Sequence, residues 1–254
     1  MPAGIVRPPL EDVEAIRMFL EEEGVAHGAH LLDVPCGIGR RAVGLAEAGF
    51  EVTAVDPNEM GITAATERIP DALVKRLHFA TASRDSLPGL PAGTRFEAIL
   101  CLDHALGRGS TADDTAFLRR LAAHVRPEGR LVLDLLNRDF FAARRRPFAF
   151  HTIGSLEQHE FRSFDPVTGV LRLDWKFYER IGEDLKHRTD SSAELTLLTP
   201  RDLASNLGQS GWRIVGVWGG WRREAVTADH RKLIVLATPA GSKGKGAFLE
   251  RAWP

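Results

Sequence analysis

Cysteine is scarce in this 254-residue sequence, which contains two, Cys36 and Cys101. Two cysteines cannot form the disulfide framework of a small secreted domain, so we expect a chain that stays reduced in the cytoplasm. Long apolar runs are also missing. No stretch approaches the roughly 18 residues of a membrane span, and the N-terminal segment lacks the apolar region of a signal peptide. The sequence therefore predicts neither membrane spanning nor secretion.

Charge of one sign is not in excess either. The chain has 33 Lys+Arg and 34 Asp+Glu, which leaves a formal net charge of −1. Without a basic excess, binding to nucleic acid loses its main electrostatic attraction, and we expect no nucleic-acid partner. The two cysteines and nine histidines form no recognisable ligand motif, so no metal is predicted. The sequence also lacks a G-x-S-x-G elbow and a phosphate-binding P-loop.

What the sequence does contain is an alternation of strand-like and helix-like segments. Apolar segments predict strands at residues 30–34, 51–55, 77–80, 96–102 and 130–136, and periodic segments predict helices at 10–23, 40–48, 58–69 and 113–124. Further along, a helix at 199–210 is followed by strands at 212–218 and 232–238. This alternation indicates βαβ units and a parallel sheet with right-handed crossovers.

The pattern changes to that of antiparallel strands between residues 147 and 197. Three strands are predicted there, at 148–164, 170–180 and 185–197, with turns at 165–169 and 182–184. We therefore expect an α/β core formed by residues 1–146 and 198–240. An antiparallel β insertion at 147–197 interrupts this core, and a flexible tail at 241–254 follows it.

A glycine-containing loop follows the first predicted strand, in the stretch DVPCGIGR. Gly37 and Gly39 let the backbone approach a ligand closely and expose amide donors. Asp56 closes the second strand 17 residues past Gly39, where a carboxylate can accept hydrogen bonds from ribose hydroxyls. Ala42 completes the dinucleotide fingerprint G-x-G-x-x-A as well, so the spacing alone leaves a nicotinamide cofactor open.

DVPCGIGR followed by VTAVDPNEM resembles the first two motifs of class I S-adenosylmethionine-dependent methyltransferases. FEAILCLDHALG resembles their fourth-strand motif, and HVRPEGRLVLDLLNRDFF their fifth strand with the turn before it. GWRIVGVWGG and RKLIVLATP resemble their sixth and antiparallel seventh strands. The resemblance covers about residues 28–140 and 196–240. It implies an α/β fold with a Rossmann-like, doubly wound sheet of seven strands, the last antiparallel, to which the β insertion is added. The implied cofactor is S-adenosyl-L-methionine.

The resemblance also implies which residues bind the cofactor. Asp33 would help to position its methionine part, Gly37 and Gly39 would pass under it, and Asp56 would hold the ribose. The other expected contacts come from the same loops and strand ends: Pro35, Cys36, Arg40, Pro57, Met60 and Leu102. Pro35 stands where the family usually has a glycine.

The end of the third strand departs further from the family, which normally has an acid there that contacts the adenine amino group. Ala82 and Ser83 stand at the aligned positions, and Asp85 comes slightly later. Either the backbone and Ser83 read the adenine, or the alignment shifts by two residues. The sequence leaves these two alternatives open.

Methyl transfer from a sulfonium is an in-line displacement that depends chiefly on alignment and on the exclusion of water. A general base is needed only for a protonated acceptor, and His104, just after the fourth strand, is the best-placed candidate. Tyr178 is the second catalytic candidate, and Asp103 and Asn137 are weaker ones. In methyltransferases that resemble this chain, such an insertion covers the cofactor and selects a small acceptor. A small-molecule substrate is therefore expected, and a homodimer is compatible with it.

Two alternatives remain from the sequence. A nicotinamide-dependent oxidoreductase is disfavoured by Asp33 ahead of the glycine loop. It is also disfavoured because Tyr178 is the only tyrosine and Gly182, not lysine, follows it by four residues. A non-catalytic cofactor-binding protein of the same fold is kept open by the unusual end of the third strand.

Overall fold

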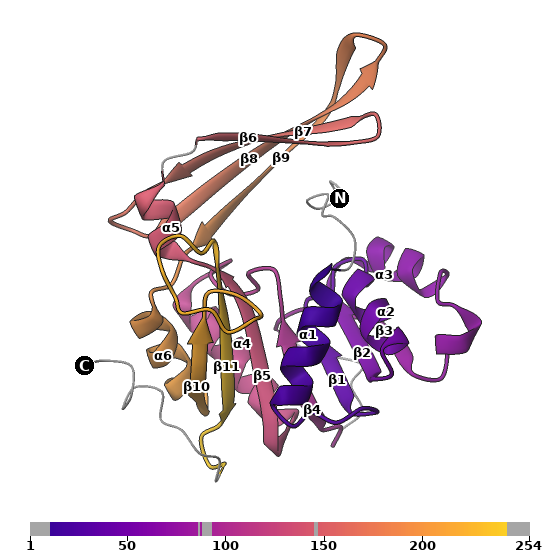
Figure 1. Ribbon diagram of the computed structural model, residues 1–254, viewed down its shortest axis with the longest axis vertical. Helices are drawn as coiled ribbons and strands as arrows, with labels where there is room; N and C mark the ends of the chain where they lie inside the picture. The colour runs from indigo at the N-terminus through magenta and orange to yellow at the C-terminus, as the bar shows by residue number, and fades with distance from the viewer. Residues whose placement is uncertain (1–10, 86, 88–92, 145–146, 243–254) are drawn as a thin grey trace.

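The computed structural model describes residues 11–85, 87, 93–144 and 147–242 (Figure 1). Its core is a seven-stranded sheet in the order β3-β2-β1-β4-β5-β11-β10. The strands are β1 (His30–Asp33), β2 (Glu51–Asp56), β3 (Leu77–Thr81), β4 (Phe96–Cys101), β5 (Val125–Leu136), β10 (Trp212–Trp218) and β11 (Lys232–Pro239). The first five are parallel to one another, and β11 is antiparallel to both β5 and β10. The predicted fold class is confirmed.

Helices cover both faces of this sheet. They are α1 (Glu11–Glu22), α2 (Arg40–Glu47), α3 (Glu59–Thr66), α4 (Thr111–Ala123) and α6 (Pro200–Gln209), with a short 3-10 helix at Asp71–Leu73. Residues of α1 and α2 pack in one apolar cluster with one face of the sheet, and residues of α4 and α6 pack in another with the opposite face. Because both faces are covered, the inner strands are mainly apolar, as in β4, where Glu97 is the one charged residue of FEAILC.

Capping explains where two of the helices begin. Ser110 accepts a hydrogen bond from the backbone N–H of Asp113, whose carboxylate in turn accepts one from the backbone of Ser110. Thr199 and Asp202 form the same reciprocal pair at the start of α6. Each pair satisfies amide groups that a helix end leaves without partners.

The segment between β5 and α6 forms a separate antiparallel sheet. Its strands are β6 (Phe148–Ile153), β7 (Leu156–Phe164), β8 (Val170–Ile181) and β9 (Asp184–Thr196), paired in that order. Helix α5 (Arg138–Ala143) leads from β5 into it. Figure 1 shows this sheet standing above the end of the core at which β5 leads into α5, and the β8–β9 hairpin reaches furthest from the core.

Three details differ from the sequence-based expectations. The single strand predicted at 148–164 is wrong, because Gly154 and Ser155 form a two-residue turn that divides it into β6 and β7. Helix α5 was not predicted. Strand β5 begins at Val125, so the predicted turn at Pro127-Glu128-Gly129 lies within it, opposite a register irregularity between Phe96 and Ala98.

Two further expectations concern the chain ends and the membrane. Most of the predicted flexible tail, residues 243–254, lies outside the described residues, as do residues 1–10. Among the helices that the structure describes, none combines the length and apolar character needed to cross a bilayer.

Candidate active site

The predicted cofactor residues meet at one edge of the sheet. Strand β1 lies between β2 and β4, so the chain connections diverge on either side of it, and ligands bind at such switch points in α/β sheets. Asp33 ends β1 and Asp56 ends β2, side by side in a parallel pair. The loop that follows β1 stays close to β2, because the backbone N–H of Cys36 donates to the carbonyl of Val55 at 2.9 Å.

The carboxylate of Asp56 closes this loop onto the end of β2. The backbone N–H of Gly37 donates to Asp56 Oδ2 at 2.8 Å, and the backbone N–H of Asn58 donates to Oδ1 at 2.9 Å. Asp56 is 7% exposed. Each carboxylate oxygen has two acceptor positions, so these bonds orient Asp56 and leave acceptor capacity for a ligand hydroxyl.

The two glycines of the loop have different physical reasons to be glycine. Both have positive φ angles, 62° at Gly37 and 75° at Gly39. A Cβ on Gly39 would lie 2.3 Å from the ring of Phe79, whereas a Cβ on Gly37 would meet no protein atom within 4 Å. Gly39 is therefore required by packing, and Gly37 borders open space beside the carboxylate of Asp56.

These features fit the cofactor that the sequence resemblance implies. An open space bordered by an exposed glycine backbone accommodates a ligand that runs close to the loop. Asp56 offers an oriented carboxylate for ribose hydroxyls, and Asp33 adds a second, 2% exposed carboxylate at the neighbouring strand end. Among the described residues, no group of three or more His, Cys, Asp or Glu side chains is placed to hold a metal ion.

Burial sets the protonation of the groups beside the loop. Desolvation raises the pKa of Asp33 to about 7, while the nearby guanidinium of Arg41 opposes the increase. Burial likewise raises the pKa of the Cys36 thiol, and the carboxylates of Asp33 and Asp56 add to that effect. Cys36 is therefore a neutral thiol, and Asp33 titrates near neutral pH in the unbound protein.

An ion-pair network that the sequence analysis missed lies next to Asp33. Arg41 Nη1 donates to Asp103 Oδ2 at 2.7 Å, and its Nη2 donates to Oδ1 at 3.2 Å. Arg41 Nε also donates to Asp12 of α1 at 2.8 Å. Asp103 and His104 both have φ angles of 58°, a backbone conformation that is uncommon outside glycine. Arg41 therefore connects α1, α2 and the turn after β4, although Arg41 and Asp103 lie 62 positions apart in sequence.

His104 is in a position that does not suit a general base. It is 4% exposed, and its Nδ1 accepts a hydrogen bond from the backbone N–H of Leu136 at 3.0 Å. Burial lowers the pKa of His104 to about 4, and the guanidinium of Arg108 adds to the shift. The ring is therefore neutral at physiological pH with its hydrogen on Nε2. These contacts favour a role in positioning the turn after β4 over a role in proton transfer.

Tyr178 lies on the face of the four-stranded sheet opposite to α5. Leu171 and Leu173 of β8 pack in one cluster with Phe141 of α5. Tyr178 is at an even-numbered position of β8, so its side chain lies on the other face of the sheet from Leu171 and Leu173. Its ring centroid is 4.8 Å from that of His159 and 5.5 Å from that of His187. A side chain on this outward face points away from α5, so the placement speaks against the catalytic role expected of Tyr178.

The other predicted cofactor residues lie around the same edge. Pro35 and Cys36 belong to the loop after β1, Arg40 is the first residue of α2, and Leu102, buried at 2%, follows β4. Pro57 precedes α3, and Met60 is its second residue and is 69% exposed. The backbone N–H of Ala82 donates to the carbonyl of Asp56 at 3.1 Å, which brings Ala82 and Ser83 beside the end of β2.

A buried ion pair, also missed from the sequence, lies at the carboxyl-terminal part of β5. Lys232 Nζ donates to Asp134 Oδ2 at 2.6 Å, and Asp134 is 3% exposed. Burial raises the pKa of Asp134, and Lys232 partly offsets this. The backbone carbonyl of Asp134 also accepts from the N–H of His104 at 2.8 Å. Because β11 runs opposite to β5, no local sequence pattern reveals this pair.

Comparison with known proteins identifies the proteins that this chain resembles. Residues 31–129 match the family model described as a methyltransferase domain. Over 129 residues the chain is 30% identical to glycine N-methyltransferase of Rattus norvegicus, an alignment that covers 45% of this chain and 43% of the relative. The chain thus spans less than half the length of that relative.

Two solved structures have the same fold over nearly the whole chain. The CcbJ methyltransferase of Streptomyces caelestis has a TM-score of 0.78 at 17% identity and covers 94% of both chains. An amino pentose methyltransferase from Micromonospora echinaspora, solved with S-adenosylmethionine bound, has a TM-score of 0.67 at 20% identity. It covers 89% of this chain and 90% of its own. This chain therefore has the fold of these methyltransferases, and its residues 31–129 match the model of a methyltransferase domain.

Proposed function

We propose that the protein transfers the methyl group of S-adenosylmethionine to a small-molecule acceptor. The observation that carries this proposal is the closed loop after β1, in which Gly37 borders open space and its N–H orients Asp56. Support comes from the methyltransferase domain match and from relatives whose names specify small acceptors, glycine in one case and an amino pentose in another.

Each cofactor contact is assigned by the chemistry of the residue that makes it. Asp56 holds the ribose hydroxyls, and the backbone at Gly37 and Gly39 lies along the cofactor. Asp33 lies toward the methionine end, where a positive charge favours its ionised form. Ala82 and Ser83, beside the end of β2, border the adenine. When bound, S-adenosylmethionine supplies a methyl group that is already electrophilic, so the protein need not activate it.

The work left for the protein is alignment of the acceptor and exclusion of water. We assign the first task to the end of β4 and to β5, where His104 bonds to Leu136 and fixes the turn. We assign the second to residues 147–197, the predicted insertion, which stands above this end of the core (Figure 1). The carboxylate of Asp103 is engaged by Arg41, and His104 is neutral and buried. The arrangement therefore suits an acceptor atom that arrives with a free electron pair.

Calorimetry with S-adenosylmethionine, S-adenosylhomocysteine and NAD tests the cofactor. We expect the first two to bind and NAD not to bind, and binding of NAD alone would refute the proposal. A second assay measures S-adenosylhomocysteine released in the presence of amine, hydroxyl, thiol and carbon acceptors. Cofactor binding without turnover across a broad panel would instead identify a non-catalytic cofactor-binding protein of this fold.

The remaining expectations concern surroundings and partners. Cys36 and Cys101 are free thiols, as in a protein of the reducing cytoplasm. The balanced charge gives no attraction to nucleic acid or to an anionic membrane surface. A homodimer is supported by the edge strand β6, where Phe148 and Phe150 are 45% and 62% exposed and no residue of FAFHTI carries a formal charge at neutral pH. Light scattering of the purified protein tests the last point.

A further inference from the structure

The inner face of β7 departs from the pattern of a packed strand. We call inner the face of the four-stranded sheet on which Leu171 and Leu173 pack against α5. Gln158 and Glu160 of β7 lie on this face at 2% exposure, whereas Phe161, on the outer face, is 40% exposed. Polar side chains are thus buried and an aromatic one is exposed, the reverse of what packing favours.

Glu160 is satisfied by its neighbours on the inner face. Its Oε2 accepts a hydrogen bond from Trp175 Nε1 at 2.7 Å, and its Oε1 accepts one from Arg162 Nε. Arg162 is two residues further along the same face, and its side chain is 11% exposed. Glu160 therefore orients the Arg162 guanidinium through its Nε atom and leaves the two terminal nitrogens unbonded by this carboxylate.

Other polar groups on this face have no partner. The amide oxygen and nitrogen of Gln158 are both buried without a hydrogen bond. Within the part of the chain that the structure describes, Arg162 makes a single side-chain hydrogen bond, through Nε, and its two terminal nitrogens make none. Buried polar groups are nearly always paired, so the unpaired amide of Gln158, next to an arginine whose terminal nitrogens make no hydrogen bond, indicates a face arranged for a polar ligand.

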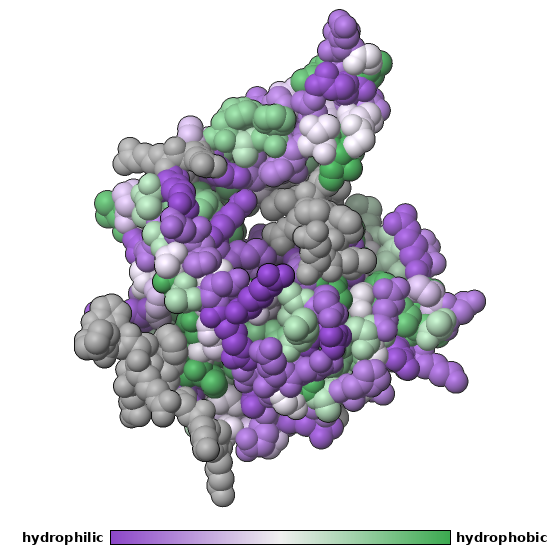
Figure 2. Space-filling model, in the orientation of Figure 1, coloured by the Kyte–Doolittle hydropathy of each residue, from purple (hydrophilic) through white to green (hydrophobic). Residues whose placement is uncertain are grey.

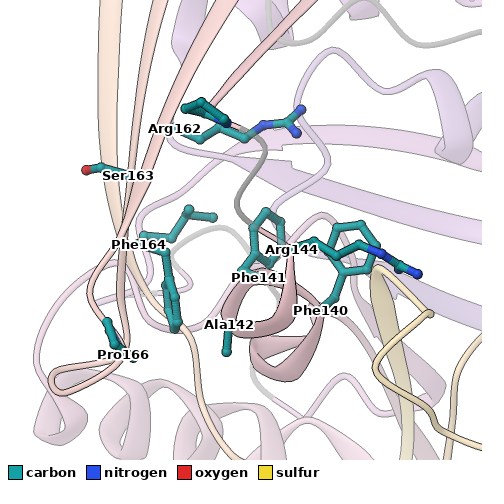
Figure 3. A pocket seen from close by; sticks show the side chains of 10 residues that line it. Phe140, Phe141, Ala142, Arg144, Arg162, Ser163, Phe164 and Pro166 are labelled. Carbon is teal, nitrogen blue, oxygen red and sulfur yellow. The ribbon is translucent and has the colours of Figure 1, made fainter.

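Arg162 also borders a cavity of about 390 Å³ between α5 and the four-stranded sheet (Figure 3). The rest of the lining is mainly apolar and includes Phe140, Phe141, Ala142, Phe164 and Leu171. In Figure 3, Phe164 from β7 and Phe141 from α5 stand on opposite sides, and the Ser163 side chain points away. A volume of this size, with few polar groups among apolar walls, is typical of small-molecule sites.

The cavity is separate from the cofactor loop but close to the end of β5. None of its lining residues belongs to the expected cofactor contacts. Leu136, the last residue of β5, packs in the same apolar cluster as Phe141 and Leu171. Since α5 follows β5 directly and Leu136 packs with two of the lining residues, the cavity lies beside the strand end that we assign to the acceptor. In the space-filling view, hydrophilic and hydrophobic residues are mixed over the surface of the molecule, including the region of α5 (Figure 2).

We propose that this cavity binds the apolar part of the methyl acceptor and that Arg162 binds a carboxylate on the same molecule. The acceptor class is thus an aryl or branched alkyl carboxylate. The two free terminal nitrogens of a guanidinium form a planar fork that matches a carboxylate, while Glu160 keeps the fork oriented. The identification of this ligand as the methyl acceptor rests on the proposed function. Binding of the ligand to the cavity can be measured without methyl transfer.

Calorimetry with 1-naphthoate, 1-naphthylmethanol and 1-naphthylmethylamine tests the site, because the three probes share the naphthyl ring and carry an anionic, a neutral and a cationic substituent. We expect 1-naphthoate to bind at least about tenfold more tightly than the alcohol, since hydrogen bonds to charged groups contribute roughly 1.5–3 kcal/mol, and the amine to bind least well. Arg162→Lys keeps the charge beside Glu160 but removes the fork. It should weaken 1-naphthoate about tenfold and leave the alcohol unchanged. Arg172→Lys, at an exposed arginine on the outer face, is the matched control.

Two alanines of α5 provide a second matched pair. Ala142 lines the cavity and Ala143 does not, and both are exposed, so tryptophan is tolerated at either position. Ala142→Trp should abolish binding of both naphthyl acid and alcohol, and Ala143→Trp should not. Equal binding of the three probes, no binding at about 5 mM, or identical behaviour of the two tryptophan variants would overturn the proposal. S-adenosylhomocysteine, titrated separately, should bind every variant normally. If S-adenosylhomocysteine binds and 1-naphthoate does not, this inference alone is refuted. If 1-naphthoate binds and S-adenosylhomocysteine does not, the proposed cofactor is refuted.

Discussion

Alanine substitution at the two loop glycines separates what packing requires from what the ligand requires. Both residues have positive φ angles, so either alanine carries a backbone penalty of about 1–2 kcal/mol. At Gly39 the new Cβ would also lie 2.3 Å from Phe79, and the ring would have to move in a packed cluster, at a further cost of about 1–3 kcal/mol. At Gly37 no protein atom is within 4 Å. We therefore expect Gly39→Ala to lower the free energy of unfolding by roughly 2–5 kcal/mol and Gly37→Ala by about half as much or less.

Urea unfolding followed by tryptophan fluorescence measures both losses. For a chain of this size each 1 kcal/mol corresponds to about 2–4 °C in Tm, so thermal scans provide a second readout. Phe79→Leu removes the ring that the Gly39 Cβ would meet. The double variant Gly39→Ala with Phe79→Leu should therefore lose less stability than the sum of its single variants. Additive losses, or equal losses at Gly37 and Gly39, would refute the packing argument.

Cofactor affinity should show the opposite order. Gly37→Ala puts a methyl group into the open space beside Asp56, where we place the cofactor, so affinity for S-adenosylhomocysteine should fall at least about tenfold while the protein stays folded. If Gly37→Ala binds S-adenosylhomocysteine as tightly as the parent chain, the loop does not contact the cofactor.

Four further predictions concern neighbouring groups. Asp56→Ala should weaken S-adenosylhomocysteine binding by about 1.5–3 kcal/mol, the contribution of hydrogen bonds to a charged group; an unchanged Kd by calorimetry contradicts the assignment of the ribose to Asp56. The pKa of Asp33 is raised from 3.8 to about 7, so the folded chain holds a proton that the unfolded chain has released, and the stability of the unbound protein should fall as pH rises from about 4 to about 7. Asp33→Asn should flatten that part of the urea-unfolding profile, and an unaltered slope excludes Asp33 as its source. The pKa of His104 is lowered from 6.5 to about 4, so its contribution to stability has the opposite sign and should increase as pH rises from about 4 to about 6.5. His104→Gln should remove this increase. It should not introduce a pH-dependent loss of turnover between pH 7 and 9, which a general base would show. Replacing residues 147–197 by a short linker should preserve S-adenosylhomocysteine binding and abolish methyl transfer, and full activity would show that the insertion does not cover the acceptor.

The core could be predicted from the sequence because its signals are local. Apolar runs such as FEAILC, with helical periods between them, locate the parallel strands, and a glycine loop followed by an acid at the next strand end locates the ligand edge. Thr199 and Pro200 likewise predict the start of α6 within one residue. The hairpin at Gly154 and Ser155 also had a local signal, a Gly-Ser pair between two strand-like segments, which the longer apolar pattern obscured.

The contacts that were missed are nonlocal. Arg41 and Asp103 meet because α2 and the turn after β4 flank the same strand, and Asp134 meets Lys232 because β11 inserts beside β5. A base was expected at position 104 because it follows the fourth strand. The sequence does not reveal that the backbone of Leu136 bonds to the imidazole and that burial lowers its pKa to about 4. Charge partners and burial depend on which strands become neighbours, and that order is a property of the whole sheet.

Strand β7 shows why a period of two does not always identify the buried side. Alternation in LEQHEFRSF places Phe161 on one face of β7 and Glu160 and Arg162 on the other. Hydrophobicity alone would predict that the face with Phe161 is the buried one. In the fold, β8 decides the orientation instead, because burying Leu171, Leu173 and Trp175 against α5 fixes the inner face of the entire sheet. The polar row of β7 must then be buried, with Trp175 and Arg162 satisfying Glu160 and leaving Gln158 unpaired. A strand that keeps glutamine, glutamate and arginine at inward positions is less stable than an apolar one, and such departures from packing rules concentrate where proteins bind ligands. The same inversion that defeats prediction of the buried face is therefore the observation on which the proposed acceptor site depends.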